Sequence, residues 1–116
     1  MNSICVTGRL TADPHHQPAN LDDGVSARTT FRLAIQGPRG EREEGHTTYI
    51  TVISHGPTAI AVADHLVKGA LVGVHGRLDY REWDDPKGQH HSIHRIISHR
   101  VEFLERRGNA TDHAAA

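Results

Sequence analysis

The stretch GPTAIAVADHLVKGALVGVHGRLDYREW, residues 56–83, decides the fold of this chain. Over residues 58–67 its apolar side chains recur at intervals of three and four, which predicts one short amphipathic helix. A Gly-Pro pair precedes this segment and a Lys-Gly pair follows it, as is typical of helix starts and stops. Residues 70–83 then favour a long strand, and Gly76 within it predicts a bulge or a bend. The stretch therefore predicts a helix that leads directly into a long strand.

Outside this stretch the chain consists of short alternating apolar and polar runs, separated by Gly, Pro and Asp. Such runs are typical of strands in small barrels and sandwiches. We predict strands at residues 2–12, 28–36, 47–55, 70–83 and 90–104. Three strands before the helix and two after it indicate an all-β, five-stranded OB-fold barrel with its one short helix between strands 3 and 4. A small β-sandwich is the structural alternative.

The length and composition indicate one domain and a reducing compartment. The 116 residues allow a single domain, which we place at residues 1–105, with a short disordered tail at 106–116. Residues 37–46 lack apolar side chains and are predicted to form an exposed, mobile loop. A single cysteine excludes an internal disulfide framework, and no apolar run approaches the roughly 20 residues that span a bilayer. We therefore expect a cytoplasmic protein with no membrane partner.

The titratable residues do not form a catalytic or metal-binding motif. The sequence has no nucleophile elbow, no P-loop and no His-Glu-x-x-His motif, so we predict neither an enzyme nor a cofactor. Eleven histidines include the group His90-His91-x-x-His94, but a strand directs His91 away from the other two. Because Cys5 also has no Cys-x-x-Cys partner, we predict no metal site. The net charge of -1 neither indicates nor excludes a nucleic-acid partner.

Several segments together carry a resemblance to a known family. They are Val6-Thr7-Gly8-Arg9-Leu10-Thr11, Phe31-Arg32-Leu33-Ala34-Ile35, Tyr49-Ile50-Thr51-Val52, Ala59–Leu66, Lys68–Leu78, Arg81-Glu82-Trp83 and Val101-Glu102-Phe103-Leu104. In this order and spacing they resemble the bacterial single-stranded-DNA-binding proteins, over about residues 2–105. The resemblance implies a homo-oligomeric OB-fold protein, typically a tetramer, that wraps single-stranded DNA with little sequence preference.

A protein of this family would protect single strands during replication, recombination or repair. The resemblance further implies association with the nucleoid, no catalytic activity and no cofactor. Two alternatives stay open: a primosomal-type OB-fold dimer that binds DNA and partner proteins, and an assembly module that has lost DNA binding. Trp83 and the segment Lys68–Leu78 favour the first interpretation, whereas Asp79 and His55 motivate the assembly module.

Binding of single strands without sequence preference requires flat side chains on an open sheet face and cations along the path of the phosphates. Alternation along the predicted strands gives one face that carries the rings, and in strand 47–55 this face also includes Ile53. The opposite face of that strand, with Ile50, Val52 and Ser54, is predicted to point into the core. We predict that the DNA contacts are made by Tyr49, Trp83, Arg32, Arg81, His55, Thr51, Arg77 and His75.

Each of these residues also has a purely structural interpretation. Tyr49 could be a half-buried strand aromatic, Trp83 a plug at the end of the barrel, and Arg32 and Arg81 ordinary solvated strand residues. The family often has an aromatic residue in place of His55 and a basic or polar one in place of Asp79. These departures predict weaker binding at neutral pH than that of a typical member.

Two further expectations concern the tail and the histidines. Replicative members end in an acidic tip such as Asp-Asp-Ile-Pro-Phe, whereas this sequence ends in Ala-Thr-Asp-His-Ala-Ala-Ala, so we expect no recruitment of partners through an acidic tip. Histidine is the side chain that gains charge between about pH 8 and pH 6. With His55 and His75 on the predicted ligand face, DNA binding is expected to tighten as the pH falls.

Overall fold

The chain folds into a closed sheet with one short helix. The computed structural model describes residues 1–37 and 46–105. Its elements are β1 (Ile4–Leu10), β2 (His15–Gln17), β3 (Arg28–Gln36), β4 (Thr47–His55), α1 (Gly56–His65), β5 (Leu71–Asp84) and β6 (His90–Glu105). The predicted all-β, OB-fold class is confirmed, and the bounds of β3 and β4 agree with those expected. Most of the expected loop at 37–46 and all of the expected tail at 106–116 lie outside the described residues.

The structure adds one strand that the sequence pattern did not predict. The short β2 lies between the first two predicted strands and pairs with the start of β3, with His16 opposite Thr29. A His16 ring nitrogen also lies 2.8 Å from the Thr29 hydroxyl oxygen. A strand of three residues is too short to show alternation, so its pairing depends on the partner strand rather than on its own sequence.

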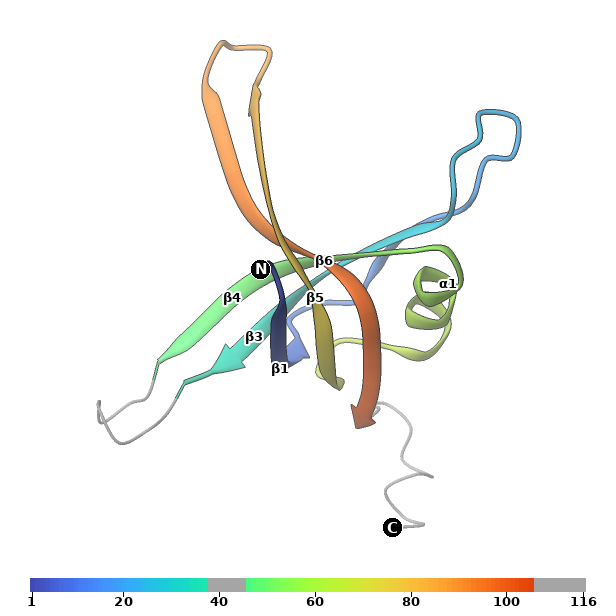
Figure 1. Ribbon diagram of the computed structural model, residues 1–116, viewed down its shortest axis with the longest axis vertical. Helices are drawn as coiled ribbons and strands as arrows, with labels where there is room; N and C mark the ends of the chain where they lie inside the picture. Colours follow the sequence, from blue (N-terminus) through green and yellow to red (C-terminus); the bar gives the residue numbers. More distant parts are fainter. Residues whose placement is uncertain (38–45, 106–116) are drawn as a thin grey trace.

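The sheet closes on itself to form the barrel (Figure 1). Its strand order is β1-β5-β6-β4-β3-β2, and an additional pairing joins β1 back to β3. This closure is short, because only Arg9 and Leu10 of β1 pair with β3. All pairings are antiparallel except β4 with β6. The barrel thus brings strands from both halves of the chain side by side.

The core occupies the inside of the barrel, and α1 covers part of it. Its fully buried side chains include Leu33, Val52, Val62, Val72 and Ile96. The helix begins two residues earlier than predicted, at a Gly56 with a φ of 65°, and ends at His65. The predicted apolar stripe is therefore wrong at Val67, which lies beyond the helix and is exposed. Among the described residues, no helix is long and apolar enough to cross a membrane.

Strands β5 and β6 extend beyond the barrel as a two-stranded hairpin (Figure 1). The pairing register shifts between His75 and Gly76, which confirms the predicted bulge. Gly76 is required there, because a Cβ atom at this position would collide with the carbonyl oxygen of Ile97. Beyond the bulge the two strands stay in register from Gly76 to Asp84. This regular register determines which side chains share each face of the hairpin.

Candidate nucleic-acid interface

One face of the sheet brings together residues from four strands. Directly paired residues on neighbouring strands point their side chains to the same side. The register pairs Arg32 with Thr51, Thr51 with Arg95, and Arg95 with Asp79, so these side chains form a row across β3, β4, β6 and β5. We call the whole surface the arginine face. It comprises Arg28, Thr30, Arg32, Ala34, Tyr49, Thr51, Ile53, His55, Arg77, Asp79, Arg81, Trp83, His91, Ile93, Arg95 and Ile97.

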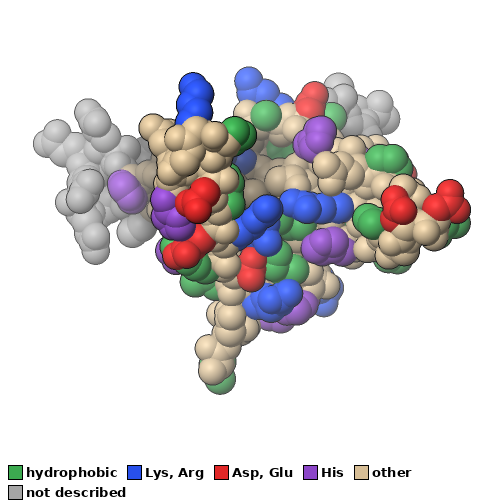
Figure 2. Space-filling view, turned by 90° about the horizontal axis from the view of Figure 1, so that it is seen from above, with side chains coloured by type: hydrophobic (Ala, Val, Ile, Leu, Met, Phe, Trp, Pro, Cys, Tyr) green, Lys and Arg blue, Asp and Glu red, His purple; other side chains and the backbone are tan. Residues whose placement is uncertain are grey.

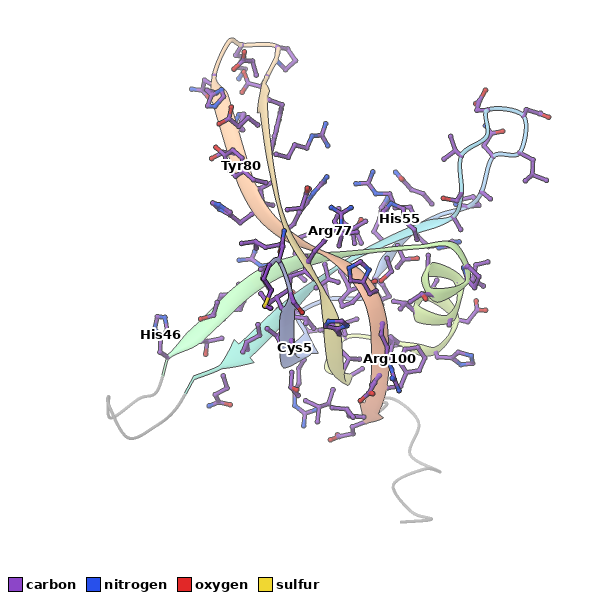
Figure 3. All side chains as sticks on the ribbon, in the orientation of Figure 1. Cys5, His46, His55, Arg77, Tyr80 and Arg100 are labelled. Atoms are coloured by element: carbon purple, nitrogen blue, oxygen red, sulfur yellow. The ribbon has the colours of Figure 1, made fainter. Side chains whose placement is uncertain are left out.

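Cations gather on this side of the molecule. Viewed from the side on which the hairpin rises, Lys and Arg side chains occupy the middle of the surface (Figure 2). Arg77 and His55 lie on this side of the sheet, whereas Cys5 and Arg100 lie lower on the barrel (Figure 3). Within the described part of the chain, the guanidinium groups of Arg28, Arg32, Arg77 and Arg81 form no salt bridge. These four cations are therefore available to contact an anionic ligand.

Tyr49 stands open on the arginine face beside one of these cations. Its residue surface is 54% exposed, and the Arg32 guanidinium carbon lies 4.9 Å from the centre of its ring. Arg32 on β3 pairs with Thr51, which lies two residues after Tyr49 on the same side of β4. Arg32 is therefore a diagonal neighbour of Tyr49 across the two strands. A planar ring and a planar cation held together in this way offer a stacking surface and a phosphate contact at one place.

Trp83 lies near the tip of the hairpin, one residue before the end of β5. It is 40% exposed, and its ring stacks on His91, with 5.4 Å between ring centres and 22° between ring planes. The Arg81 guanidinium carbon lies 5.6 Å from the centre of the indole. Because the hairpin projects beyond the barrel, Trp83 does not plug the end of the barrel.

The centre of the arginine face is less open than the sequence pattern predicted. Ile53 is only 2% exposed, although it shares its side of β4 with Tyr49 and His55. The reason is the position of β4 inside the sheet, because Thr30 on β3 and Ile97 on β6 flank Ile53 on both sides. The expectation that this whole side of β4 is accessible is therefore wrong at Ile53. The predicted burial of Val52 and Ser54 is confirmed, whereas Ile50 is only partly buried and packs against the core.

One carboxylate lies among the arginines. Arg95 Nε donates a hydrogen bond of 2.8 Å to Asp79 Oδ2, and the two side chains are 19% and 28% exposed. Asp79 thus neutralises the arginine at the middle of the row. This ion pair gives a structural reason for the weaker binding predicted from Asp79.

The two candidate histidines occupy different places. His55 is exposed at the end of β4, pairs with Arg28 and precedes α1. His75 lies before the bulge, on the part of β5 that pairs with β1, where its Nε2 is 3.1 Å from the Ser3 hydroxyl oxygen. Its ring is also 5.8 Å from that of His99. The arginine face therefore includes all the predicted contact residues except His75.

Sequence reasoning missed the residues that β6 contributes. Arg95 and His91 belong to the arginine face because of their pairing with β5, and alternation within a single strand does not reveal this pairing. The short segment 84–89 between the two predicted strands, which contains Asp, Pro and Gly, was a usable signal, since it predicts a turn and residues on either side of a short turn face each other. Arg28 was missed although alternation within the predicted strand 28–36 already places it on the same face as Arg32.

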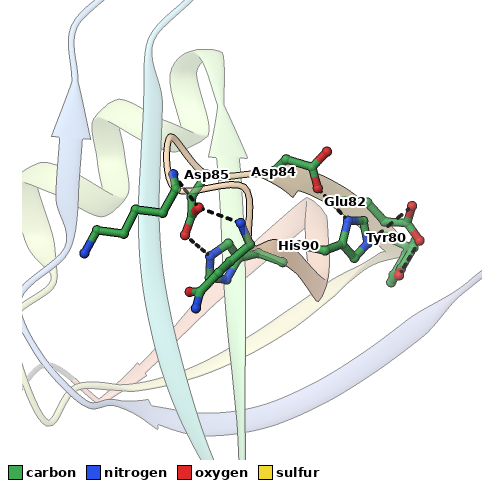
Figure 4. Close-up of polar contacts among 8 residues, drawn as sticks. Tyr80, Glu82, Asp84, Asp85 and His90 are labelled. Carbon is green, nitrogen blue, oxygen red and sulfur yellow. Dashed lines mark hydrogen bonds and ion pairs between the residues drawn. The ribbon is translucent and has the colours of Figure 1, made fainter.

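The opposite face of the hairpin has a different character, and we call it the acidic face. It comprises Leu78, Tyr80, Glu82, Asp84, His90, Ser92 and His94. His90 Nδ1 lies 2.9 Å from Asp84 Oδ1, and the Tyr80 hydroxyl donates a 2.7 Å hydrogen bond to Glu82 (Figure 4). This bond to a carboxylate raises the pKa of Tyr80 above its ordinary value. Within the described residues, no group of three or more His, Cys, Asp or Glu side chains is placed to hold a metal ion.

Known proteins resemble this chain over nearly its whole length. The model of the family described as "Single-strand binding protein family" matches residues 1–104. A "Single-stranded DNA-binding protein" of Halalkalibacterium halodurans is 34% identical over 94% of this chain and 64% of its own length. "Single-stranded DNA-binding protein 1" of Clostridium acetobutylicum is 33% identical over 95% of this chain and 99% of its own length. "Single-stranded DNA-binding protein 2" of Staphylococcus aureus is 34% identical, with 94% and 77% covered.

Proposed function

The chain belongs to the single-strand binding protein family, and from this premise we propose that its arginine face binds single-stranded DNA with little sequence preference. The observation that carries the proposal is the unbroken register from Arg32 through Thr51 and Arg95 to Asp79. This register places Tyr49 and Trp83 on one side of the sheet, with arginines between them. Stacking on rings tolerates any base, and arginines contact the phosphates that all sequences share.

The proposed role is protection of single strands during replication, recombination or repair. It requires binding alone, so we assign the protein no catalytic step and no cofactor. Proteins with this role act where chromosomal single strands arise, which places this one in the cytoplasm, at the nucleoid.

A titration with oligo-dT tests the proposal directly. Trp83 is the only tryptophan, so we expect its fluorescence to be quenched as oligo-dT binds. The anisotropy of a labelled oligo-dT gives a second, independent signal of binding. If the labelled oligomer does not bind at low salt, the proposal is wrong and the assembly module becomes the better interpretation.

A pair of matched variants tests the assignment of the arginine face. Arg77 lies on this face, whereas Arg100 lies on the lower part of the barrel and pairs with Glu102 at 3.0 Å (Figure 3). Removing one phosphate contact lowers the salt dependence of binding to single strands by about 0.7 in the log–log slope. We expect this loss for Arg77→Ala and no change for Arg100→Ala. Equal slopes for the two variants would contradict the assignment.

We also propose that the protein is a homo-oligomer, a tetramer or a dimer. Within the described residues, Ile4–Gly8 pair with β5 on one side, while β1 pairs with β3 only at Arg9 and Leu10. The remaining edge of β1 can accept a strand from a second copy. Light scattering should therefore give a mass that is a multiple of 12.8 kDa, and a stable monomer at micromolar concentration would contradict this.

A further inference from the structure

Trp83 is held by a chain of contacts that starts in the turn of the hairpin. The Oδ1 atom of Asp85 accepts hydrogen bonds from the backbone N–H groups of Lys87 at 2.9 Å and Gln89 at 2.8 Å. Its other oxygen, Oδ2, lies 2.9 Å from His91 Nε2 (Figure 4). His91 in turn stacks on the indole, at 5.4 Å and 22°. One carboxylate therefore connects the turn to the ring.

We infer that Asp85 and His91 are positioning residues for Trp83, which hold its ring ready to stack on a base. This inference rests on the proposed function, because it names the support of a ring in the proposed binding site. His91 stacks on one face of the indole, so the inferred base stacks on the opposite face, near the Arg81 guanidinium, whose carbon lies 5.6 Å from the ring centre. The resulting order is imidazole, indole and base.

The physical gain is that the ring is oriented before the ligand arrives. An exposed tryptophan near a hairpin tip has several rotamers, and binding must select one of them. Immobilising such a side chain on binding has an entropic cost. Because Asp85 holds the imidazole in the folded protein, the contact with His91 restricts the rotamers of Trp83 before DNA binds. Less side-chain entropy is then lost on binding.

Among the described residues, the charged groups near His91 come from the turn and from β5. Asp85 faces it from the turn, and the guanidinium group of Arg81 on β5 lies over the indole ring, with its carbon 5.6 Å from the ring centre. His90, although adjacent in sequence, belongs to the acidic face with Asp84. Among the described residues, His91 therefore has one carboxylate partner, Asp85, and this contact is present in the protein without DNA.

The free protein allows a test that does not depend on DNA. A protonated imidazole in contact with an indole quenches its fluorescence, and Trp83 is the only tryptophan. We expect the emission of the wild type to fall as the pH decreases from about 8 to about 5. His91→Gln, which lacks the ring, and His91→Phe, which cannot be protonated, should lose this pH dependence. His94→Gln should retain it, because His94 lies on the same strand but packs against Tyr80 on the other face.

Affinity for oligo-dT at neutral pH tests whether the contact matters for binding. We expect His91→Gln to bind about 3- to 10-fold more weakly, which corresponds to the ordering of one side chain. His91→Phe should restore most of the loss, because it supplies a stacked ring without a charge. His94→Gln should bind like the wild type. Circular dichroism of each variant confirms that the barrel is folded.

The results separate this inference from the proposed function. If His91→Gln keeps the pH-dependent emission of the wild type, or binds oligo-dT as tightly, the positioning role is wrong. If His91→Phe is as weak as His91→Gln, the ring is not what supports Trp83, and the inference is also wrong. If the wild type itself does not bind oligo-dT, both ideas fail for DNA, while the emission profile still reports whether the contact exists.

Discussion

The two faces of the β5–β6 hairpin are made by alternate residues of the same strands, yet they differ in charge and in partners. The arginine face carries Arg77, Arg81 and Arg95 with Trp83, and its one carboxylate, Asp79, is paired. The acidic face carries Glu82 and Asp84, and its histidines and Tyr80 contact these carboxylates or each other (Figure 4).

This difference supports the proposal that Trp83, and not Tyr80, faces the ligand. Both faces hold an exposed ring, Trp83 on one and Tyr80 on the other, and each ring packs against a histidine. Within the described hairpin, only Trp83 has arginines without a salt bridge on its side. Phosphates are attracted to the arginine face and repelled by the carboxylates of the acidic face. Exposure of a ring is therefore not enough to identify a base-stacking residue.

The largest expected effect comes from disturbing the register that separates the two faces. Gly76→Ala places a Cβ atom against the carbonyl oxygen of Ile97, so we expect it to destabilise the fold by about 1–3 kcal/mol or more. Gly73→Ala is the matched control on the same strand, since its Cβ would make only ordinary contacts. Urea unfolding monitored by circular dichroism measures the free energy of unfolding of both variants. Equal stabilities would show that the bulge does not require glycine.

The rings of the two faces should contribute unequally to binding. We expect Trp83→Ala to weaken binding of oligo-dT by about 1–3 kcal/mol, the range for one stacked base. Tyr80→Ala removes a similarly accessible ring from the acidic face and should change the affinity much less. Anisotropy of a labelled oligomer measures both variants, because it does not need the tryptophan. A loss at Tyr80 as large as that at Trp83 would remove the distinction between the faces.

The carboxylates of the two faces should also act differently. Asp79→Asn releases Arg95 from its 2.8 Å ion pair, so we expect tighter binding and a salt dependence that is steeper by about 0.7 in the log–log slope. Glu82→Gln removes a carboxylate on the acidic face and should leave this slope nearly unchanged. Titrations at several salt concentrations give the slopes. If Asp79→Asn has the same salt-dependence slope as the wild type, Arg95 does not reach the DNA.

The pH dependence of binding should depend on His55 more than on His75. A phosphate near His55 favours its protonated form, so protons are taken up on binding and affinity rises as the pH falls from about 8 to about 6. The salt slope of the wild type should then be steeper at pH 6, by up to about 0.7 for one engaged histidine. His55→Gln should abolish this change, and His75→Gln should retain it. The reverse result would place the DNA path over the β1 side of the barrel.

The smallest expected effect concerns the turn that joins the two faces. The hydrogen bond to His91, together with the backbone N–H groups of Gln89 and Lys87, lowers the pKa of Asp85. A lowered pKa in the folded state gives stability that is present above the unfolded value of about 3.9 and is lost as the pH falls through the folded value. The Trp83 emission of the wild type should therefore change in a second step below about pH 4. Asp85→Asn should lack this step, and its persistence would assign the step to another carboxylate.

Much of the fold was predictable because its information is local. The alternation in residues 28–36 and 47–55 is visible in the sequence, and these bounds coincide with β3 and β4. Gly76 indicated the bulge, since an isolated glycine inside a strand pattern is typical of a close backbone approach. The short β2 was missed because its pairing is decided by β3 and not by its own residues.

The sequence by itself determined the strand-rich fold, the resemblance to its family and the rings and arginines available for binding, because alternation and residue type are properties of short segments. Only the tertiary structure decided which of these side chains act together. The parallel pairing of β4 with β6 joins segments that are far apart in the sequence, and it aligns Thr51 with Arg95. The hairpin register then pairs Arg95 with Asp79 and Trp83 with His91. No local pattern contains these pairings, because they depend on how the barrel closes and on the register shift at Gly76 that aligns β5 with β6.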